Sequence, residues 1–254
     1  MANTNRLMET VQEIREKSPL VHNITNYVVM NNTANALLAI GASPVMAHAL
    51  EEVEDIASIS SSLVINMGTL SPKWVEAMER AMKKANELNK PIVFDPVGVG
   101  ASAYRTETAL RLVDNYQPSV IRGNASEIMA LAKMSHETKG VDSTMSSENA
   151  VDAARSLSKK FGNTVVVSGE IDYVVTGDQT TEVKGGSSLM PKVTGMGCTA
   201  TSMIGACIAV NSNYHQASIN GMEIMAQAGS QAETTSNGPG SFQMNFIDSL
   251  YQLS

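Results

Sequence analysis

The feature that most constrains the fold is a repeated alternation of helix-like segments with short apolar runs. One helix-like segment opens at Ser71 and Pro72 and carries apolar residues on one face, from Val75 through Met82 to Leu88. Strands that alternate with helices of this length form βαβ units, in which helices cover both faces of a mostly parallel sheet. We therefore expect a three-layer α/β fold, with helices over residues 28–40, 71–88, 107–115, from 124 onward and 147–161, and strands over residues 63–68, 91–95, 119–121 and 164–167.

One stretch departs from this alternation. Residues 172–178 and 180–183 look like strands around a Gly-Asp turn, which predicts an antiparallel hairpin that extends the sheet. From Cys198 onward the chain reads as helical, and the polar residues 134–147 are expected to form a surface loop. No repeat or linker divides the chain, and 254 residues of which 43% are hydrophobic can bury one core, so a single domain over residues 1–254 is expected.

The charge of the chain argues against some classes of partner. Its formal net charge is −7 without any cluster of Lys or Arg, which disfavours nucleic acid and anionic membrane surfaces. No apolar run approaches the roughly 20 residues that span a bilayer, and residues 3–6 do not begin a signal peptide. On one helix, Cys198 and Cys207 would lie roughly 13 Å apart and point to opposite sides, so free thiols are expected. These features favour a cytoplasmic protein that acts on a small molecule.

A Gly-x-Gly turn at residues 195–197 leads directly into a helix of small residues. The first N–H groups of a helix lack partners and carry partial positive charge, so glycines at this point allow an anion to approach the backbone closely. Gly195, Gly197 and the following Cys198 therefore predict a phosphate site. The alternative is that the glycines only make a tight turn and allow close packing of a helix on a sheet.

Polar residues follow the apolar runs, where a parallel sheet binds ligands beyond the carboxyl ends of its strands. Asp95 follows one run, Arg122 and Glu127 follow the next, and Ser168 follows another. Taken singly, Asp95 could end a strand, Arg122 could be a surface charge and Glu127 could cap a helix. Together they supply carboxylates for hydrated Mg²⁺, and a guanidinium and a hydroxyl for phosphates.

These segments together resemble the hydroxyethylthiazole kinases of the ribokinase-like superfamily. The resemblance covers nearly the whole chain and is carried by residues 21–26, 40–46, 66–70, 94–101, 121–127 and 195–198. It implies a ribokinase-like fold and transfer of the ATP γ-phosphate to the hydroxyl of 4-methyl-5-(2-hydroxyethyl)thiazole, making the thiazole phosphate used for thiamine. Enzymes of this family are similar to one another in forming trimers with active sites at subunit interfaces, so a homotrimer is also expected.

The resemblance implies roles for individual residues. Arg122 and Ser168 would contact ATP, Asp95 and Glu127 would serve Mg²⁺ directly or through water, Met46 and Gly195 would contact the thiazole, and Asn26 would lie near the thiazole pocket. Related sugar and pyrimidine kinases carry an aspartate base at the position of Cys198, so this chain departs from their pattern. A helix N-terminus can lower a thiol pKa, which leaves both a thiol and a thiolate open at Cys198.

Some interpretations remain open at this point. His22 is interpreted as a core residue, because the family mechanism requires no imidazole base. Met46 is either ordinary core filler or a thioether contact for a flat ring. A lyase on the same fold, such as an ATP-dependent dehydratase of hydrated nicotinamide cofactors, is an alternative that residues 22–26 and 66–70 disfavour. A nucleotide or vitamin-precursor sensor is another, although a binder need not keep Asp95, Arg122 and Glu127 together.

Overall fold

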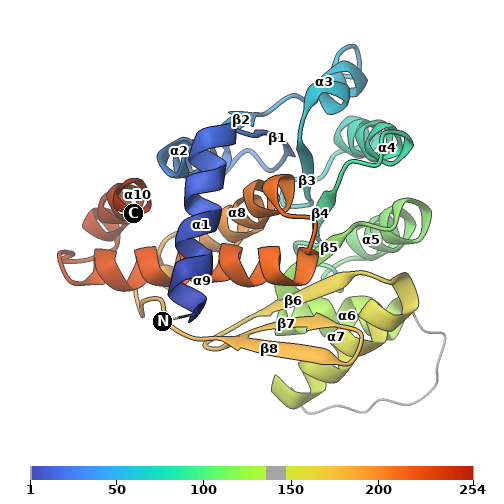
Figure 1. Cartoon of the computed structure of the whole chain (residues 1–254). Coiled ribbons are helices and arrows are strands. Elements are labelled where there is room, and N and C mark those ends of the chain that lie inside the picture. The colour runs from blue at the N-terminus through green and yellow to red at the C-terminus, as the bar shows by residue number, and fades with distance from the viewer. Residues whose placement is uncertain (1, 136–146, 254) are drawn as a thin grey trace.

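A central eight-stranded sheet organises the molecule in the computed structural model, which describes residues 2–135 and 147–253 (Figure 1). Its strand order is β2-β1-β3-β4-β5-β6-β7-β8. Neighbouring strands are parallel from β2 to β6, whereas β7 runs antiparallel to both β6 and β8. The strands are β1 Leu20–Ile24, β2 Ser43–Val45, β3 Ser62–Asn66, β4 Ile92–Asp95, β5 Val120–Asn124, β6 Thr164–Ser168, β7 Asp172–Thr176 and β8 Gln179–Val183.

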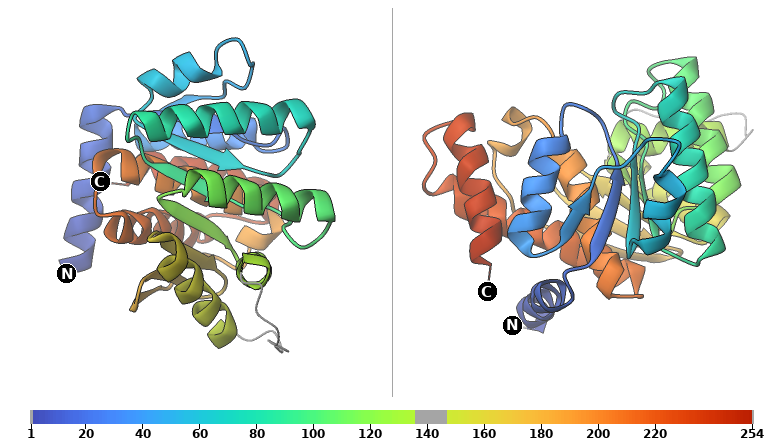
Figure 2. Two further views of the ribbon diagram at one scale, coloured as in Figure 1. Left: turned by 90° about the vertical axis from the view of Figure 1, so that its right-hand side faces the viewer. Right: turned by 90° about the horizontal axis from the view of Figure 1, so that it is seen from above.

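Helices cover both faces of this sheet, which confirms the three-layer expectation (Figures 1 and 2). On one side α8 and α9 lie against the strands, and α1, α2 and α10 pack around them; α3 to α7 cover the other side. The helices are α1 Ala2–Lys17, α2 Met30–Ile40, α3 Val53–Ile59, α4 Pro72–Glu87, α5 Ala103–Tyr116, α6 Ala125–Ser135, α7 Ser147–Phe161, α8 Met196–Val210, α9 Tyr214–Glu233 and α10 Pro239–Gln252. A short 3₁₀ helix, Met190–Lys192, precedes α8.

Strand β3 shows why the apolar runs of the sequence become central strands. Its residues are buried along their whole length. Val64 packs into the core under α8, whereas Leu63 and Ile65 pack into the core on the opposite face. Because successive side chains of a strand point to opposite faces, a strand between two helical layers must be apolar at every central position.

Local signals placed several helix ends correctly. Ser71 caps α4 by accepting a hydrogen bond from the Trp74 N–H at 3.3 Å, and Gly41 ends α2 in the left-handed conformation with φ of 100°. The apolar pattern wrongly places Leu88 on the buried face of α4. The helix ends at Glu87, and Leu88 is 46% exposed at the cap.

Other boundaries and elements differ from the expectations. Helix α5 begins four residues earlier than predicted, because the Ser102 hydroxyl caps it, and α8 begins at Met196 rather than at Cys198. The hairpin of β7 and β8 is confirmed, whereas β1 and β2 were not predicted as strands. Of the predicted loop 134–147, Met134 and Ser135 belong to α6 and Ser147 begins α7; residues 136–146 lie outside the described residues.

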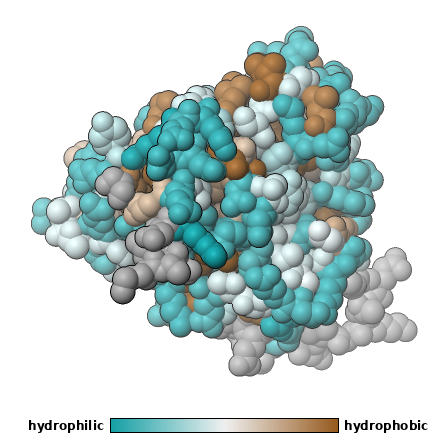
Figure 3. Space-filling view, viewed as in Figure 1, coloured by the Kyte–Doolittle hydropathy of each residue, from teal (hydrophilic) through white to brown (hydrophobic). Residues whose placement is uncertain are grey.

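The face viewed in Figure 3 is mostly hydrophilic, with hydrophobic side chains in separate patches. Hydrophobic side chains also stand exposed at individual positions, among them Ile59 at the end of α3 and Tyr251 in α10. Scattered residues of this kind are normal on a folded protein. Across the described residues, every helix is too short or too polar to cross a bilayer.

Two buried histidines link stability to pH. His22 in β1 donates from Nε2 to the Ala47 carbonyl at 2.7 Å, and its Nδ1 has no partner among the described residues. His22 is therefore a core residue, as predicted. His215 lies between the hydroxyls of Thr176 and Thr181, at 2.9 and 3.0 Å. Burial lowers the pKa of both imidazoles below their ordinary value of 6.5, so folding favours the neutral rings.

Because folding lowers the pKa of both imidazoles, the stability of the protein depends on pH. Stability contributed by the neutral rings is complete above pH 6.5 and is lost as the pH falls from there toward the lower folded-state pKa. The amide of His215→Gln keeps hydrogen-bonding capacity without titrating. When the pH is lowered from about 7.5 to about 5.5, we therefore expect the melting temperature of this variant to fall less than that of the wild type. Circular dichroism melts at both pH values measure this difference. An equal or larger loss in the variant would contradict it.

Candidate active site

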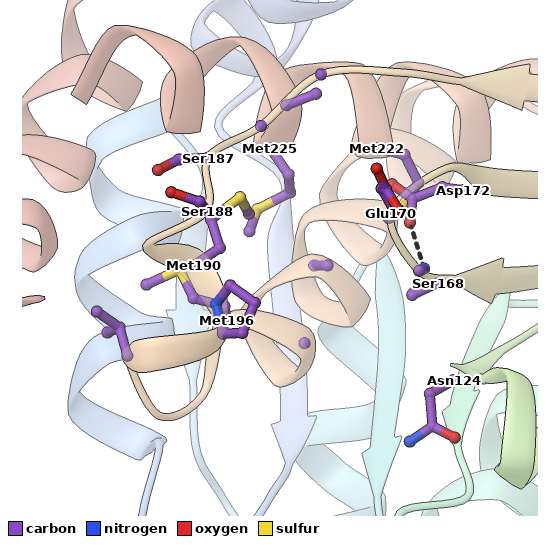
Figure 4. A pocket seen from close by; sticks show the side chains of 18 of the residues that line it. Asn124, Ser168, Glu170, Asp172, Ser187, Ser188, Met190, Met196, Met222 and Met225 are labelled. Carbon is purple, nitrogen blue, oxygen red and sulfur yellow. Dashed lines mark hydrogen bonds between the residues drawn. The ribbon is translucent and has the colours of Figure 1, made fainter. Parts of the chain in front are cut away.

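A cavity of about 920 Å³ lies at the carboxyl ends of the parallel strands (Figure 4). Four predicted site residues line it: Arg122, Ser168, Gly195 and Gly197. Figure 4 shows its two walls, one carrying Ser168, Glu170 and Asp172 and the other Ser187, Ser188, Met190 and Met196. Arg122 and Ser168, from the neighbouring strands β5 and β6, therefore meet at this edge of the sheet, whereas Asp95 and Glu127 are not among the lining residues.

The start of α8 provides unpaired backbone donors to this cavity. Gly195 has φ of 87°, and a Cβ there would lie 2.7 Å from Val29 Cγ1, so the position requires glycine. The first hydrogen bond of the helix runs from the Thr199 N–H to the Gly195 carbonyl at 2.8 Å. The preceding N–H groups of residues 196–198 have no partner among the described residues. An anion in the cavity can therefore accept from the helix start.

Gly197 brings a guanidinium to the same point. A Cβ at Gly197 would lie 2.7 Å from Arg122 Nη1, so the absent side chain leaves the bare backbone beside the positive charge. The two glycines do make a tight turn, as the alternative interpretation held. They also open the helix start and Arg122 to one anion.

Arg122 is buried rather than a surface charge, since only 9% of it is exposed. It lies in β5, and its Nε donates to Ser168 Oγ of the neighbouring strand β6 at 2.8 Å. Its Nη1 lies 3.7 Å from Asp95 Oδ2. The adjacent strand ends therefore assemble a guanidinium, a hydroxyl and a carboxylate, although the sequence separates Arg122 and Ser168 by 46 residues.

Asp95 is a buried carboxyl group at the end of β4. Its Oδ2 accepts hydrogen bonds from Asn66 Nδ2 at 2.9 Å and Thr201 Oγ1 at 2.7 Å. Burial raises its pKa to about 6, although Arg122 and both hydrogen bonds act in the opposite direction. Asp95 Oδ1 is buried without a partner among the described residues, so it retains lone pairs for a cation or for water held by one.

Glu127 stabilises the start of α6 through its carboxylate. Its Oε2 accepts from the Asn124 N–H, and Asn124 Oδ1 accepts from the Glu127 N–H, both at 2.9 Å, which confirms the predicted capping box. Its Oε1 accepts from the Gly98 N–H at 2.9 Å. Each carboxylate oxygen keeps further lone pairs, which suits contact with a metal through water.

The donor set fits Mg²⁺ that enters with a nucleotide. Magnesium prefers oxygen ligands, keeps several waters and is commonly held by one or two carboxylates together with substrate phosphates. Asp95 and Glu127 provide two carboxylates, and the free Asp95 Oδ1 is available. Within residues 2–135 and 147–253, no group of three or more His, Cys, Asp or Glu side chains could hold a metal by itself.

Cys198 has the environment of a thiol rather than a thiolate. Burial and the nearby Asp95 carboxylate raise its pKa, and they outweigh hydrogen bonds from the amides of Asn66 and Asn26. The Asn26 Nδ2 lies 3.5 Å from the Sγ atom. With its pKa raised, the Cys198 thiol is a weak proton acceptor at neutral pH.

Asn26 and Met46 are not among the residues that line the 920 Å³ cavity. Asn26 follows β1, is buried and contacts Cys198, whereas Met46 follows β2 and makes no described hydrogen bond with the other site residues. The two loops are joined through Trp74. Its Nε1 donates to the Thr25 carbonyl at 3.1 Å, and its ring stacks on His48 with 3.9 Å between centroids.

Sequence reasoning missed several residues that hold this site together. Asn66 and Thr201 hydrogen-bond to Asp95, and Arg105 donates to the carbonyls of Met67, Val97 and Gly68 at 2.5 to 2.7 Å. Asn66 had a signal, because it is a polar residue at the end of an apolar run. Arg105 and Thr201 lie inside helices, and no pattern in the sequence marks them as site residues. Their contacts depend on how those helices pack against the sheet.

Comparison with known proteins agrees with this geometry. Residues 11–254 match the model of the hydroxyethylthiazole kinase family. A hydroxyethylthiazole kinase from Leptospira biflexa is 53% identical over 246 residues, which are 97% of this chain and 92% of that protein. The structure of a hydroxyethylthiazole kinase from Pyrococcus horikoshii is similar with a TM-score of 0.91 and 41% identity, covering 98% of this chain and 93% of that one.

More distant structures show the fold alone. A ribokinase-like superfamily protein from Enterococcus faecalis is similar with a TM-score of 0.63 at 13% identity, over 92% of this chain and 87% of that one. The predicted ribokinase-like architecture is therefore confirmed.

Proposed function

The chain belongs to the hydroxyethylthiazole kinase family and is a kinase, and on that basis we propose that it transfers the γ-phosphate of ATP to the hydroxyl of 4-methyl-5-(2-hydroxyethyl)thiazole. The product would be the thiazole monophosphate used in thiamine biosynthesis or salvage. The hydroxyl oxygen forms a bond to the γ-phosphorus, and the bond from phosphorus to the bridging oxygen breaks. The electron pair of that bond leaves on ADP, and the hydroxyl proton passes to a phosphoryl oxygen.

One observation carries this proposal: the anion side and the acceptor side of the site are physically continuous. Arg122 lies beside Asp95, Asn66 joins Asp95 to Asn26, and Asn26 contacts Cys198 at the start of α8. A phosphate at the helix start would therefore lie between ATP on one side and the acceptor on the other. Phosphoryl transfer depends mainly on this kind of positioning and on neutralised charge.

Each predicted residue has a place in the proposed reaction. Arg122 and Ser168 would hold the ATP phosphates, and the N–H groups after Gly195, those of Gly197 and Cys198 among them, would donate hydrogen bonds to the transferred phosphoryl group. Met46 and Gly195 would contact the thiazole, and Asn26 would lie near the thiazole pocket. Asp95 and Glu127 would hold the Mg²⁺ that accompanies ATP and neutralises phosphate charge when bound.

We propose further that the protein is cytoplasmic and forms a homotrimer. The two free cysteines, Cys198 and Cys207, suit a reducing compartment. Tyr27 and Val28, directly after Asn26, are 65% and 62% exposed, which places apolar surface next to the acceptor side. An active site completed at a subunit interface would cover that surface.

The test is a coupled assay of ADP release with the thiazole alcohol, with pyridoxine and hydroxymethylpyrimidine as competing acceptors. We expect the thiazole to stimulate ADP release most strongly and a chelator of divalent metals to suppress it, because the phosphate charge then lacks its counter-ion. Unchanged ADP release with the thiazole, together with a rise with another alcohol, would overturn the substrate assignment. Stimulation by a hydrated nicotinamide cofactor alone would identify the lyase instead.

A further inference from the structure

Asn66 lies at the centre of the hydrogen-bond network that joins the two sides of the site. It is the last residue of β3 and is 1% exposed. Its Oδ1 accepts from Asn26 Nδ2 at 2.8 Å and from the Gly68 N–H at 2.9 Å, and its Nδ2 donates to Asp95 Oδ2 at 2.9 Å. The single amide therefore contacts both the acceptor side and the carboxylate beside Arg122.

The partners of Asn66 leave its amide one orientation. A backbone N–H can only donate, so the atom facing Gly68 must be the amide oxygen. An ionised Asp95 can only accept, so the atom facing it must be the amide nitrogen. A reversed amide would place like groups against each other at both contacts, and buried unpaired polar atoms are costly.

The orientation of Asn66 then determines that of Asn26. The oxygen of Asn66 requires a donor, so Asn26 turns its Nδ2 toward Asn66, and the same nitrogen faces Cys198 Sγ. Gly68 supports Asn26 from behind, since a Cβ at residue 68 would overlap the Asn26 side chain. Asn26 Oδ1 accepts no hydrogen bond from another described residue, and the Asn26 side chain contacts Cys198 at the start of α8.

We propose that Asn66 is a positioning residue that aims the free Oδ1 of Asn26 at the hydroxyl group of the acceptor. The proposal rests on the proposed kinase function and deepens it. The hydroxyl donates its hydrogen to Asn26 Oδ1, which directs an oxygen lone pair toward the phosphoryl group at the helix start. A neutral amide takes no proton, so Asn26 orients the nucleophile without acting as its base.

Asn66→Ala tests the proposal by steady-state kinetics. We expect kcat/KM for the thiazole to fall about 10- to 100-fold, because an acceptor misplaced by an ångström reacts far more slowly, while KM for ATP changes less than about threefold. Asn23→Ala is the matched control. Asn23 is an equally buried asparagine on the adjacent strand β1, hydrogen-bonded to the Val21 carbonyl and the Ser202 hydroxyl, outside the site.

A double-mutant cycle separates positioning from a purely structural role. If Asn66 acts through Asn26, Asn66→Ala in an Asn26→Ala background should cost no more than about threefold further. If the losses in kcat/KM of the two single variants multiply in the double variant, the proposal is overturned. A loss in Asn23→Ala as large as that in Asn66→Ala would also overturn it. Should Asn66→Ala fail to fold, Asn66→Ser replaces it, since its hydroxyl is too short to reach Asn26.

Alkylation of Cys198 by iodoacetamide gives a readout that needs no substrate. Cys207 is fully buried, so alkylation of the folded protein reports on Cys198. An amide N–H stabilises the reactive thiolate, so Asn26→Ala should slow alkylation by about threefold or more, and Asn23→Ala should not. Asn66→Ala removes its own amide beside Cys198 as well as the contact that turns Asn26 toward it, so it should slow alkylation at least as much as Asn26→Ala. Wild-type alkylation rates in Asn66→Ala would overturn the proposed orientation. Slowed alkylation in a protein inactive on the thiazole would support the orientation and refute the proposed function.

Discussion

Gly197→Val is expected to abolish phosphoryl transfer, whereas Cys198→Ala should lose only a modest part of it. A Cβ at Gly197 would already lie 2.7 Å from Arg122 Nη1, and a branched side chain would cover the backbone where an anion must approach. Removal of one donor of this kind commonly costs about 100- to 1,000-fold in kcat. Cys198, in contrast, has a raised pKa and is a poor base.

The measurement is kcat of Gly197→Val, Cys198→Ala and Cys198→Asp at several pH values, with folding checked by circular dichroism. Cys198→Asp should remain active, because it places a carboxylate where related kinases carry their base, within reach of the Asn26 amide. A general base contributes about 100- to 10,000-fold. A loss of that size in Cys198→Ala, with a wild-type profile that follows a thiol ionisation, would show that Cys198 is an essential base.

Arg122→Ala is expected to lower kcat/KM for ATP by about 100- to 1,000-fold, because it removes the guanidinium that faces the proposed phosphate site. The substitution also leaves Asp95 buried without the positive charge 3.7 Å away, so the pKa of Asp95 should rise further and the carboxylate should be harder to form. Arg122→Lys keeps the charge and loses the planar contact with Ser168, so it should recover part of the activity.

Arg111→Ala is the control for Arg122→Ala. Arg111 pairs with Glu79 on the surface at 2.8 Å, and exposed pairs contribute little to stability. Initial rates over a range of ATP concentrations, with thermal melts of each protein, give the comparison. Arg122→Ala kinetics equal to those of Arg111→Ala would remove Arg122 from the site.

Sequence patterns predicted those parts of the fold that depend on neighbouring residues. Ser71 and Pro72 open α4, Gly41 ends α2, and the apolar run of β3 becomes a central strand. The reciprocal bonds of Asn124 and Glu127 were likewise readable, because both partners lie within one helical turn. The strand β1 could not be predicted, because its residues His22 and Asn23 are polar yet buried. Hydrogen bonds to residues distant in the chain, Ala47 and Ser202, offset part of the cost of that burial.

Part of the candidate site could be predicted from the topology of the sheet rather than from neighbouring residues. Parallel strands end at one edge, so the polar residues after Phe94, Ile121 and Val167 had to gather there, and the resemblance to a kinase family gave them expected roles. Their contacts could not be derived in this way. The distance from Arg122 to Ser168 depends on the register of β5 and β6, and Thr201 reaches Asp95 only because α8 packs across the sheet.

The amino-acid sequence by itself determined the α/β alternation, the hairpin, the glycines at the start of α8 and the family to which the chain is similar. These follow from local conformational preferences and from the order of residue types along the chain. Only the tertiary structure decided that Arg122 is buried beside Asp95, that burial and Asp95 raise the pKa of the Cys198 thiol, and that the Asn66 amide contacts Asn26. Burial, charge and hydrogen-bond direction depend on groups that are distant in the chain and meet only after folding.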